Sequence, residues 1–555
     1  MTKADLKIWW HKWWFGFVLS SLLISYQLAS LITFISSTPK GFRWLGHLAF
    51  NMTDYPVYLN YLLQGKTHFL ISNLYNNFSQ IPRFDIFWSL GGLLVRAGLS
   101  PVMTHEILRW FCTVALALAV YATAKSLVTS ERWARLASLF MLSGLSLGWI
   151  YSAWRDLGGP EFKSAGPTPP DLVTEFGVAP VLIGGAHMIL SLALELLSVR
   201  WIYELICLKK KNRLVPLILV SLFFTWLHPY FIPLLGCQAL ICLVVAYRKK
   251  DKTKSLPYFL VVGASFIPAA GYYVYLALMD SAFKDHFLIS NQLRLGSGWT
   301  WLLALLPLLW AAGRLLMRKV PSELFQTKFP AWALFWIISA LICLALPFPW
   351  QRKYTQGLLM AGVILTLPYW LMVSESILSK WRTGIKRLFY LSPPHLIIKA
   401  AGSAFGVIFF IFFICAPYLY LFQIQLTTLR PDFIYSFYES NSLFSAWNFL
   451  ESNQNNHMVI TDNLWINLWT PAKTGLHVWI GHAHETPDYW ARFEQYSEWL
   501  KTDQVDGFNR FLNENQINVI IATTLANQSR FERLIDHQSW QKTFEQSQIT
   551  VWSKK

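Results

Sequence analysis

The chain has 555 residues, of which 54% are hydrophobic and 14% are charged. A soluble protein carries roughly a quarter charged residues, so this composition excludes an ordinary soluble globular protein. The net charge is +17, but the basic residues stand in short clusters between apolar runs. That arrangement is typical of membrane topology and argues against nucleic acid as a partner. We therefore expect a polytopic α-helical protein embedded in a lipid bilayer.

Eleven apolar runs are predicted to be transmembrane helices, because each is about 17–25 residues long, the length that crosses a bilayer. They cover approximately residues 14–36, 101–124, 134–153, 179–207, two runs that flank 226–230, 256–278, 299–317, 331–346, a run that ends near 373, and 399–422. Lysines before the first run place the N-terminus in the cytoplasm. Eleven spans then put the C-terminus outside, and every dense basic cluster falls on the cytoplasmic side.

Two domains are predicted, divided at residue 422. Residues 1–422 form the transmembrane domain, which has a large first outer loop at 37–100. Within that loop, the short apolar segment 84–95 is expected to form an interfacial or re-entrant helix. Residues 423–555 are richer in charged residues, Asn and Gln, and lack a run long enough to span. We expect them to form an extracytoplasmic α/β domain.

The secondary structure of this C-terminal domain follows from its apolar patterns. The alternating or continuous apolar segments at 457–461 and 517–522 predict strands. The segments at 444–452, 487–500 and 506–515 have the period of amphipathic helices. The six cysteines lie in or beside apolar runs without metal-ligand spacing, so neither a disulfide nor a zinc site is predicted.

Polar side chains suited to chemistry gather on the predicted outer side. They are Asp54 in the first outer loop, Asp171 and Glu175 in the second, His187 in the fourth span, His228 at an outer turn, and Arg352 and Lys353 at another. A carboxylate can take a proton from an attacking hydroxyl, and the fork of an arginine suits a phosphate. Together these groups indicate a site for an anionic, lipid-bound substrate.

Each of these groups also has a purely structural interpretation. Asp54 could be the N-cap of the helix that follows it. The two acidic residues of the second loop could only solvate that loop, and the two histidines could serve packing or a turn. The basic pair could consist of residues that snorkel to the membrane interface. His482 and His484 alternate and would share one face of a strand, so a metal is an alternative there, although a structural or substrate-facing loop is favoured.

Short motifs along most of the chain resemble one superfamily of membrane enzymes. Those of the first loop and its flank are Asp54-Tyr55-Pro56-Val57-Tyr58-Leu59, Gly65, Asn73, Tyr75, Phe87-Trp88, Gly98-Leu99-Ser100-Pro101 and Arg109. Later ones are Pro170-Asp171-Leu172, Glu175, His187, His228-Pro229-Tyr230, Gln351-Arg352-Lys353, Gly357, Gly481-His482 and Glu485-Thr486-Pro487. The set resembles a bacterial branch of the GT-C fold glycosyltransferases, which transfer sugars from polyprenyl-phosphate carriers at the outer membrane face.

The resemblance implies roles for individual residues. Asp54 would be the general base, and Arg352 with Lys353 would bind the phosphate of the donor. Binding or positioning of the substrates would fall to Tyr58, Asp171, Glu175, His187 and His228. The chain lacks an Asp-x-Asp in the first loop, because Met52 and Pro56 stand two positions either side of Asp54. We therefore expect no cofactor, with a divalent metal at the acidic pair of the second loop as the alternative.

The function predicted from this resemblance is an inverting glycosyltransferase. Its partners would be a polyprenyl-phosphate-linked sugar donor, an acceptor that the sequence does not name, and the lipid bilayer, with no nucleic acid. The expected location is a bacterial inner or plasma membrane. The alternative is a transporter or flippase for a lipid-linked or anionic substrate, which should carry ionisable groups deep in its spans. Glu195 and Glu204 of the fourth span are the main such groups. A third interpretation is a non-catalytic membrane scaffold.

Overall fold

The computed structural model describes residues 3–48, 52–76, 81–157, 177–248, 252–280, 283–284, 298–317, 325, 330–348, 350–388, 408, 411–412, 414–426, 429, 436–453 and 457–555. The chain divides into two compact units. One, here called the helical unit, consists of Met1–Gln27, Trp110–Ala270 and Asn291–Ile424. The other, called the α/β unit, consists of Leu28–Arg109, Gly271–Ser290 and Gln425–Lys555.

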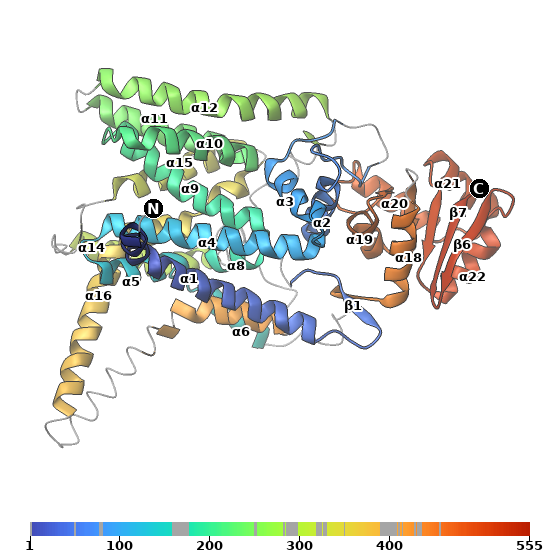
Figure 1. Cartoon of the computed structure of the whole chain (residues 1–555), viewed down its shortest axis with the longest axis horizontal. Coiled ribbons are helices and arrows are strands. Elements are labelled where there is room, and N and C mark those ends of the chain that lie inside the picture. The colour runs from blue at the N-terminus through green and yellow to red at the C-terminus, as the bar shows by residue number, and fades with distance from the viewer. Residues whose placement is uncertain are drawn as a thin grey trace. The chain divides into compact units, whose positions relative to one another are not determined.

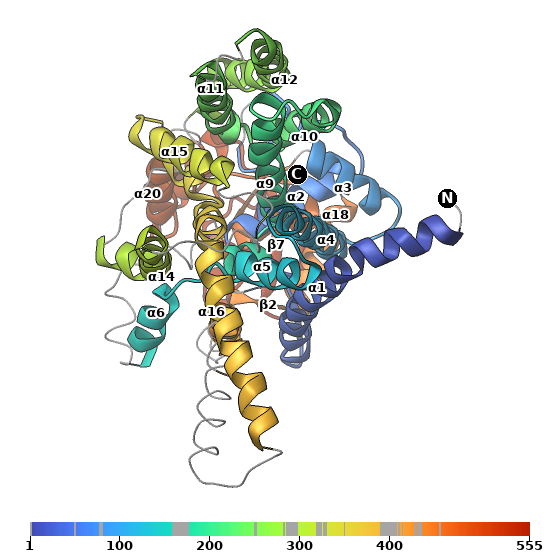
Figure 2. The same ribbon diagram turned by 90° about the vertical axis from the view of Figure 1, so that its left-hand side faces the viewer.

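The helical unit contains, wholly or in part, the following described helices (Figures 1 and 2). They are α1 (Lys3–Ser36), α4 (Pro101–Leu127), α5 (Glu131–Ser143), α6 (Gly148–Leu157), α8 (Val178–Ile183), α9 (Ala186–Ile206), α10 (Leu214–Leu227), α11 (Ile232–Arg248), α12 (Lys252–Met279), α14 (Gly298–Met317), α15 (Ala331–Ala345) and α16 (Leu358–Leu388). α9 packs against α10, α11 and α15, whereas α16 packs against α5, α14 and α15. Short 3₁₀ turns, η2 (Lys211–Arg213), η3 (Pro229–Phe231) and η5 (Gln351–Thr355), join some of them.

Six helices among the described residues are long and apolar enough to cross a membrane. They cover Lys12–Ser36, Pro101–Leu127, Pro229–Arg248, Ser255–Met279, Trp299–Met317 and Gln351–Ser379. Three shorter apolar helices are Ile86–Arg96, Ala331–Ala345 and Ile414–Leu426. The chain is thus a helical membrane protein with a separate α/β region, and the full set of eleven spans stays a prediction.

Two of the predicted spans are interrupted in the structure. The run at 134–153 is divided between α5 and α6, because Gly144 adopts a left-handed conformation (φ 70°) that ends α5. The run at 179–207 is divided between α8 and α9 at Gly184 and Gly185. The predicted turn before Pro229 is confirmed: α10 ends at Leu227 and the next helix turn begins at the proline.

The α/β unit is built around a five-stranded sheet in its C-terminal part, drawn as arrows in Figure 1. The strands are β3 (Met458–Thr461), β4 (His477–Val478), β5 (Val519–Ala522), β6 (Trp540–Gln546) and β7 (Ile549–Lys554), in the order β4-β3-β5-β7-β6. β3 pairs in parallel with β4 and β5, and β5 pairs antiparallel with β7. The predicted strands at 457–461 and 517–522 are confirmed, since they correspond to β3 and β5.

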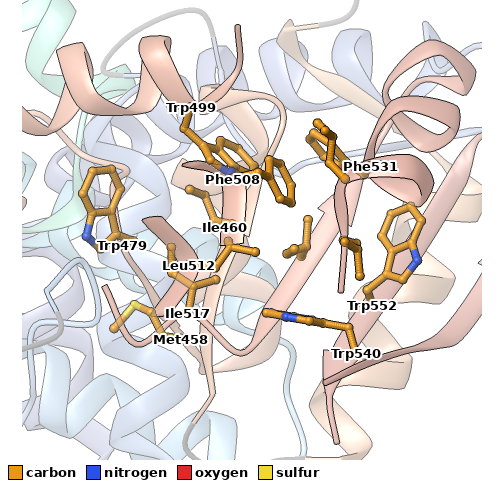
Figure 3. Packing of buried hydrophobic residues seen from close by; sticks show 14 of the residues in the cluster. Met458, Ile460, Trp479, Trp499, Phe508, Leu512, Ile517, Phe531, Trp540 and Trp552 are labelled. Atoms are coloured by element: carbon orange, nitrogen blue, oxygen red, sulfur yellow. The ribbon is translucent and has the colours of Figure 1, made fainter. Parts of the chain in front are cut away.

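Helices complete this sheet and bury its apolar side chains. They are α18 (Asn441–Ser452), α19 (Leu464–Thr474), α20 (Tyr489–Trp499), α21 (Val505–Glu514) and α22 (Leu525–Leu534), three of which were predicted from the sequence. Figure 3 shows Trp499, Phe508 and Phe531 turned toward one another in the core, with ring centroids 5.3–5.4 Å apart. The sheet is therefore held by a core of its own, dominated by aromatic residues.

The segment predicted to be the first outer loop, residues 37–100, joins this domain by backbone pairing. Its strand β1 (Phe42–Trp44) pairs antiparallel with β2 (Tyr438–Ser440). Its helices α2 (Asp54–Gly65) and α3 (Ile86–Arg96) pack so closely that Gly65 and Gly92 meet backbone to backbone. The amide of Val478, in β4, also donates to the carbonyl of Leu74 in the loop (2.8 Å). The loop and the C-terminal domain are consequently one folded body.

Candidate functional site

Asp54 is the first residue of α2, and its carboxylate contacts a histidine from the C-terminal domain. His482 Nε2 lies 3.0 Å from Asp54 Oδ1, and the hydroxyl of Tyr58 lies 3.5 Å from Oδ2. Thr53, not Asp54, holds the N-cap position of α2, so capping does not account for the placement of this carboxylate. The side chain of Asp54 is 35% exposed, whereas that of His482 is 5% exposed. The site thus has one solvated acid supported by a buried imidazole.

The turn after β4 holds His482 in place. The His482 carbonyl accepts hydrogen bonds from the amides of Glu485 and Thr486 (3.1 and 2.9 Å). The Thr486 hydroxyl in turn accepts from the amide of Gly481 (3.1 Å). A side chain at position 481 would meet the ring of Tyr75 at 2.7 Å, so only glycine fits there. These bonds fix the backbone from which the imidazole projects.

Glu485 ties the same turn to the first outer loop. Its carboxylate accepts from the hydroxyl of Tyr61, on α2 (3.2 Å), and pairs with Arg83 (3.5 Å). Burial, and then the nearby Glu485 charge, raise the pKa of Tyr61 well above its ordinary value. Its hydroxyl therefore stays protonated and remains a donor. The amide of Asn73 also donates to the Glu485 carbonyl (2.7 Å).

Tyr58 belongs to an aromatic group beneath Asp54. Its ring is nearly parallel to that of Trp88 on α3, with centroids 5.1 Å apart, and to that of His105 at 6.3 Å. Tyr58 lies four residues after Asp54, so the two side chains share a face of α2. The stacking holds the phenol where its hydroxyl reaches the carboxylate.

A second group of predicted residues meets in the helical unit. His187, near the start of α9, stacks on His228, at the end of α10, with ring centroids 5.2 Å apart. His228 lies 6.0 Å from the ring of Tyr230. The ammonium of Lys353 lies 5.8 Å from the centre of that same ring. His228 and Lys353 thus lie beside the ring of Tyr230, and His187 stacks on His228.

A buried acid, Glu195 of α9, holds the turn that carries Arg352 and Lys353. The Gln356 amide donates to Ser191 (2.8 Å) and to Glu195 Oε2 (3.1 Å), and the Trp336 indole donates to Glu195 Oε1 (2.9 Å). Gly357 has φ 73° and packs against Trp336, where a Cβ would come within 2.2 Å of the ring. Glu195 is fully buried, and its two described partners are neutral donors.

The predicted site residues therefore fall into two described groups. Asp54 and Tyr58 belong to the α/β unit, whereas His187, His228, Arg352 and Lys353 belong to the helical unit. Asp171 and Glu175 lie outside the described residues. Within the part of the chain that the structure describes, no group of three or more His, Cys, Asp or Glu residues is placed to hold a metal ion.

Sequence reasoning missed the partners of these residues. It noted His482 as a member of a His-x-His pair and of a motif that resembles the superfamily, without linking it to Asp54, and it noted Glu195 only as an acid within a span. The signal for His482 was its place after a short strand, in a segment that resembles the C-terminal domain of a known superfamily. The signal for Glu195 was its isolation, because an ionisable residue at bilayer depth requires a partner.

The fold and these two groups define a helical membrane protein with an acid at the start of α2 and a basic turn at η5. No protein-family model and no curated protein sequence matches the chain. Among solved structures, the chain is similar across most of its length to the GT-C glycosyltransferases AglB and ArnT.

The archaeal oligosaccharyltransferase AglB from Archaeoglobus fulgidus, solved with an inhibitory peptide and a dolichol-phosphate, is 11% identical with a TM-score of 0.46. That match covers 95% of this chain and 71% of AglB. ArnT from Cupriavidus metallidurans, solved with undecaprenyl phosphate, is 12% identical with a TM-score of 0.45, and the match covers 96% and 98% of the two chains. Because both scores are below 0.5, the function of this chain is inferred below from its own residues.

Proposed function

We propose that this protein is an inverting glycosyltransferase that uses a polyprenyl-phosphate-linked sugar at the outer face of a bacterial plasma membrane. The observation that carries the proposal is the Asp54 carboxylate, which is partly exposed, starts the outer-loop helix and is held by His482 at 3.0 Å. The motifs of this loop and of the Arg352 turn, quoted above, resemble those of GT-C enzymes. The N-terminus is then cytoplasmic and the α/β domain extracytoplasmic.

The proposed chemistry needs one proton acceptor and one site for a leaving phosphate. The acceptor hydroxyl gives its proton to Asp54 as its oxygen attacks the anomeric carbon. A new carbon–oxygen bond forms, the bond from that carbon to the phosphate oxygen breaks, and the configuration inverts. The polyprenyl phosphate leaves with the bonding electron pair, so its negative charge must be stabilised.

Arg352 and Lys353 are assigned to that phosphate. Both lie in η5, after the C-terminal end of α15, and Lys353 lies over the ring of Tyr230. An arginine presents two parallel donors to phosphate oxygens, and a lysine adds a point charge. Tyr58, His187 and His228 are assigned to positioning the substrates, as are Asp171 and Glu175. No step of this chemistry requires a metal.

Transfer by purified protein in lipid nanodiscs tests the proposal. The native protein, Asp54→Asn and Asp506→Asn are incubated with a panel of polyprenyl-phosphate sugars and acceptor lipids. Asp506 is the matched control, because it is an exposed aspartate in the first turn of another helix, α21. We expect a loss of about 100-fold or more for Asp54→Asn and none for Asp506→Asn. Equal turnover by native protein and Asp54→Asn would refute Asp54 as the base.

The same donors, offered to the protein in proteoliposomes, separate the transferase from the transporter alternative. A transporter or flippase would move the labelled lipid-linked sugar between bilayer leaflets of a proteoliposome without releasing polyprenyl phosphate. A transferase releases polyprenyl phosphate in proportion to the glycosylated product. Translocation without release would refute the proposed function.

A further inference from the structure

The Asp54–His482 contact has a defined direction. The Nδ1 atom of His482 lies 3.3 Å from the backbone amide of His484, which can only donate, so Nδ1 accepts. A neutral imidazole that accepts at Nδ1 carries its proton on Nε2. His482 Nε2–H therefore donates to Asp54 Oδ1 at 3.0 Å. The imidazole needs no positive charge to make either bond.

This donor occupies only one of the two carboxylate oxygens. The hydroxyl of Tyr58 lies 3.5 Å from the other oxygen, Oδ2, which is at the long limit of a hydrogen bond. Asp54 is 35% exposed while His482 is buried. Oδ1 thus contacts the buried imidazole at 3.0 Å, and Oδ2 contacts the Tyr58 hydroxyl at 3.5 Å.

Two contacts along one face of α2 hold this helix against the turn that contains His482. Asp54, Tyr58 and Tyr61 are spaced by four and then three residues, so they lie on the same side of the helix. Asp54 meets His482 at one end of this face, and Tyr61 meets Glu485 near the other. His482 and Glu485 belong to the same turn, whose backbone is fixed by its own hydrogen bonds. The rotation of α2 relative to His482 is consequently fixed.

We propose that His482 is a positioning residue for Asp54, supplied by the C-terminal domain. It holds the Asp54 carboxylate in the orientation in which that carboxylate receives the proton of the acceptor hydroxyl. This inference rests on the proposed function, in which Asp54 is the base. It gives the C-terminal domain a part in the reaction itself, because the chain's last domain completes the support of an acid located in its first loop. Orientation of a reacting group within a fraction of an ångström is worth up to about 100-fold in rate.

Two substitutions of similar size test the donor. His482→Gln keeps an N–H donor near the position of Nε2, whereas His482→Met fills the space without one. His537→Ala is the control, because His537 is an exposed histidine of the same unit. We expect kcat to fall about 10- to 100-fold in His482→Met, with the KM for the donor lipid within about twofold. His482→Gln should recover most of the loss, and His537→Ala should match the native protein.

Thermal unfolding of each variant distinguishes positioning from simple folding support. If His482→Met has the same melting temperature as the native protein but a lower kcat than His482→Gln, the positioning role is supported. Equal kcat for the Gln and Met variants overturns it, whether or not both are destabilised. Equal kcat for the native protein and His482→Met overturns it as well.

A spectroscopic test does not depend on turnover. In ¹⁵N-histidine spectra, the resonance lost in His482→Gln identifies His482 among the 13 histidines. We expect the neutral tautomer with the proton on Nε2, and a shift of that resonance in Asp54→Asn. A charged ring, the other tautomer, or no response to Asp54→Asn would overturn the inference. If the spectra agree with the inference but no donor is turned over, the result counts against the proposed function, whereas the Asp54–His482 contact is still supported.

Discussion

Replacing Glu195 by leucine should loosen the turn that carries Arg352 and Lys353. Glu195 is fully buried, and it accepts from the indole of Trp336 and from the amide of Gln356. Trp336 is 0% exposed and Gln356 is 2% exposed, so water cannot replace the lost acceptor. Each buried donor left without a partner costs about 1–3 kcal/mol.

The combined cost of losing both hydrogen bonds to Glu195 is less than twice the highest cost of one, because Gln356 keeps its bond to Ser191 (2.8 Å). We therefore expect Glu195→Leu to destabilise this turn by about 2–4 kcal/mol. Glu195→Gln is the matched control. It retains a carbonyl for the indole, and the Gln356 amide can turn its own oxygen toward the new amide. Its cost should stay below about 1 kcal/mol.

Hydrogen exchange of the purified protein in nanodiscs measures this difference locally. Amides of residues 351–357 should exchange roughly 30- to 700-fold faster in Glu195→Leu than in the native protein, since each 1.4 kcal/mol is a factor of ten. Exchange in the β5 and β7 strands of the other unit serves as the internal reference. Equal protection in the native protein and Glu195→Leu would refute the anchoring role. Equally accelerated exchange in Glu195→Gln and Glu195→Leu would show that the carboxylate itself, and not merely an acceptor at this position, is required.

Three further predictions concern the α/β unit and are checked by unfolding in nanodiscs. Gly92→Ala should destabilise it by about 2–3 kcal/mol, because the new methyl would come within 2.3 Å of the Gly65 backbone. Gly91→Ala, whose methyl would meet only flexible leucine side chains, should cost less, and equal effects would contradict this reasoning. Burial raises the pKa of Asp85 to about 6, so the folded state binds its proton more tightly than the unfolded state. The free energy of unfolding should then fall from about pH 4 to 6, and Asp85→Asn should remove that slope. Burial lowers the pKa of Lys473 to about 8, so stability should rise from about pH 8 to 10, and Lys473→Met should abolish the rise. Unchanged slopes in these variants would contradict both assignments.

Much of the local structure was predictable because its causes are local. The turn before Pro229 follows from the missing amide of proline, and β3 and β5 follow from short apolar runs bounded by polar residues. The interruptions at Gly144 and Gly184 were not predictable in the same way. Glycine is tolerated inside apolar helices, so its presence alone does not reveal where the chain adopts a left-handed or irregular conformation.

The candidate site shows the same division between local and distant causes. The sequence singled out Asp54, because an acid beside a long apolar run requires a function or a partner, and it singled out the basic pair, because outer basic residues are few. It could not pair Asp54 with His482, which lies 428 positions away. Nor could it place His187 and His228 in one stack or set Glu195 beneath the basic turn.

The sequence by itself determined the membrane class, the long apolar helices that the structure describes and the strands β3 and β5, and it proposed the residue types suited to the chemistry. All of these depend on composition and on hydrophobic period, which are read from neighbouring residues. Only the tertiary structure decided which residues support them: His482 for Asp54, Glu485 for Tyr61, and Glu195 for the Arg352 turn. Those contacts arise from the packing of segments hundreds of residues apart, and hydrophobic period carries no information about which polar groups that packing brings together.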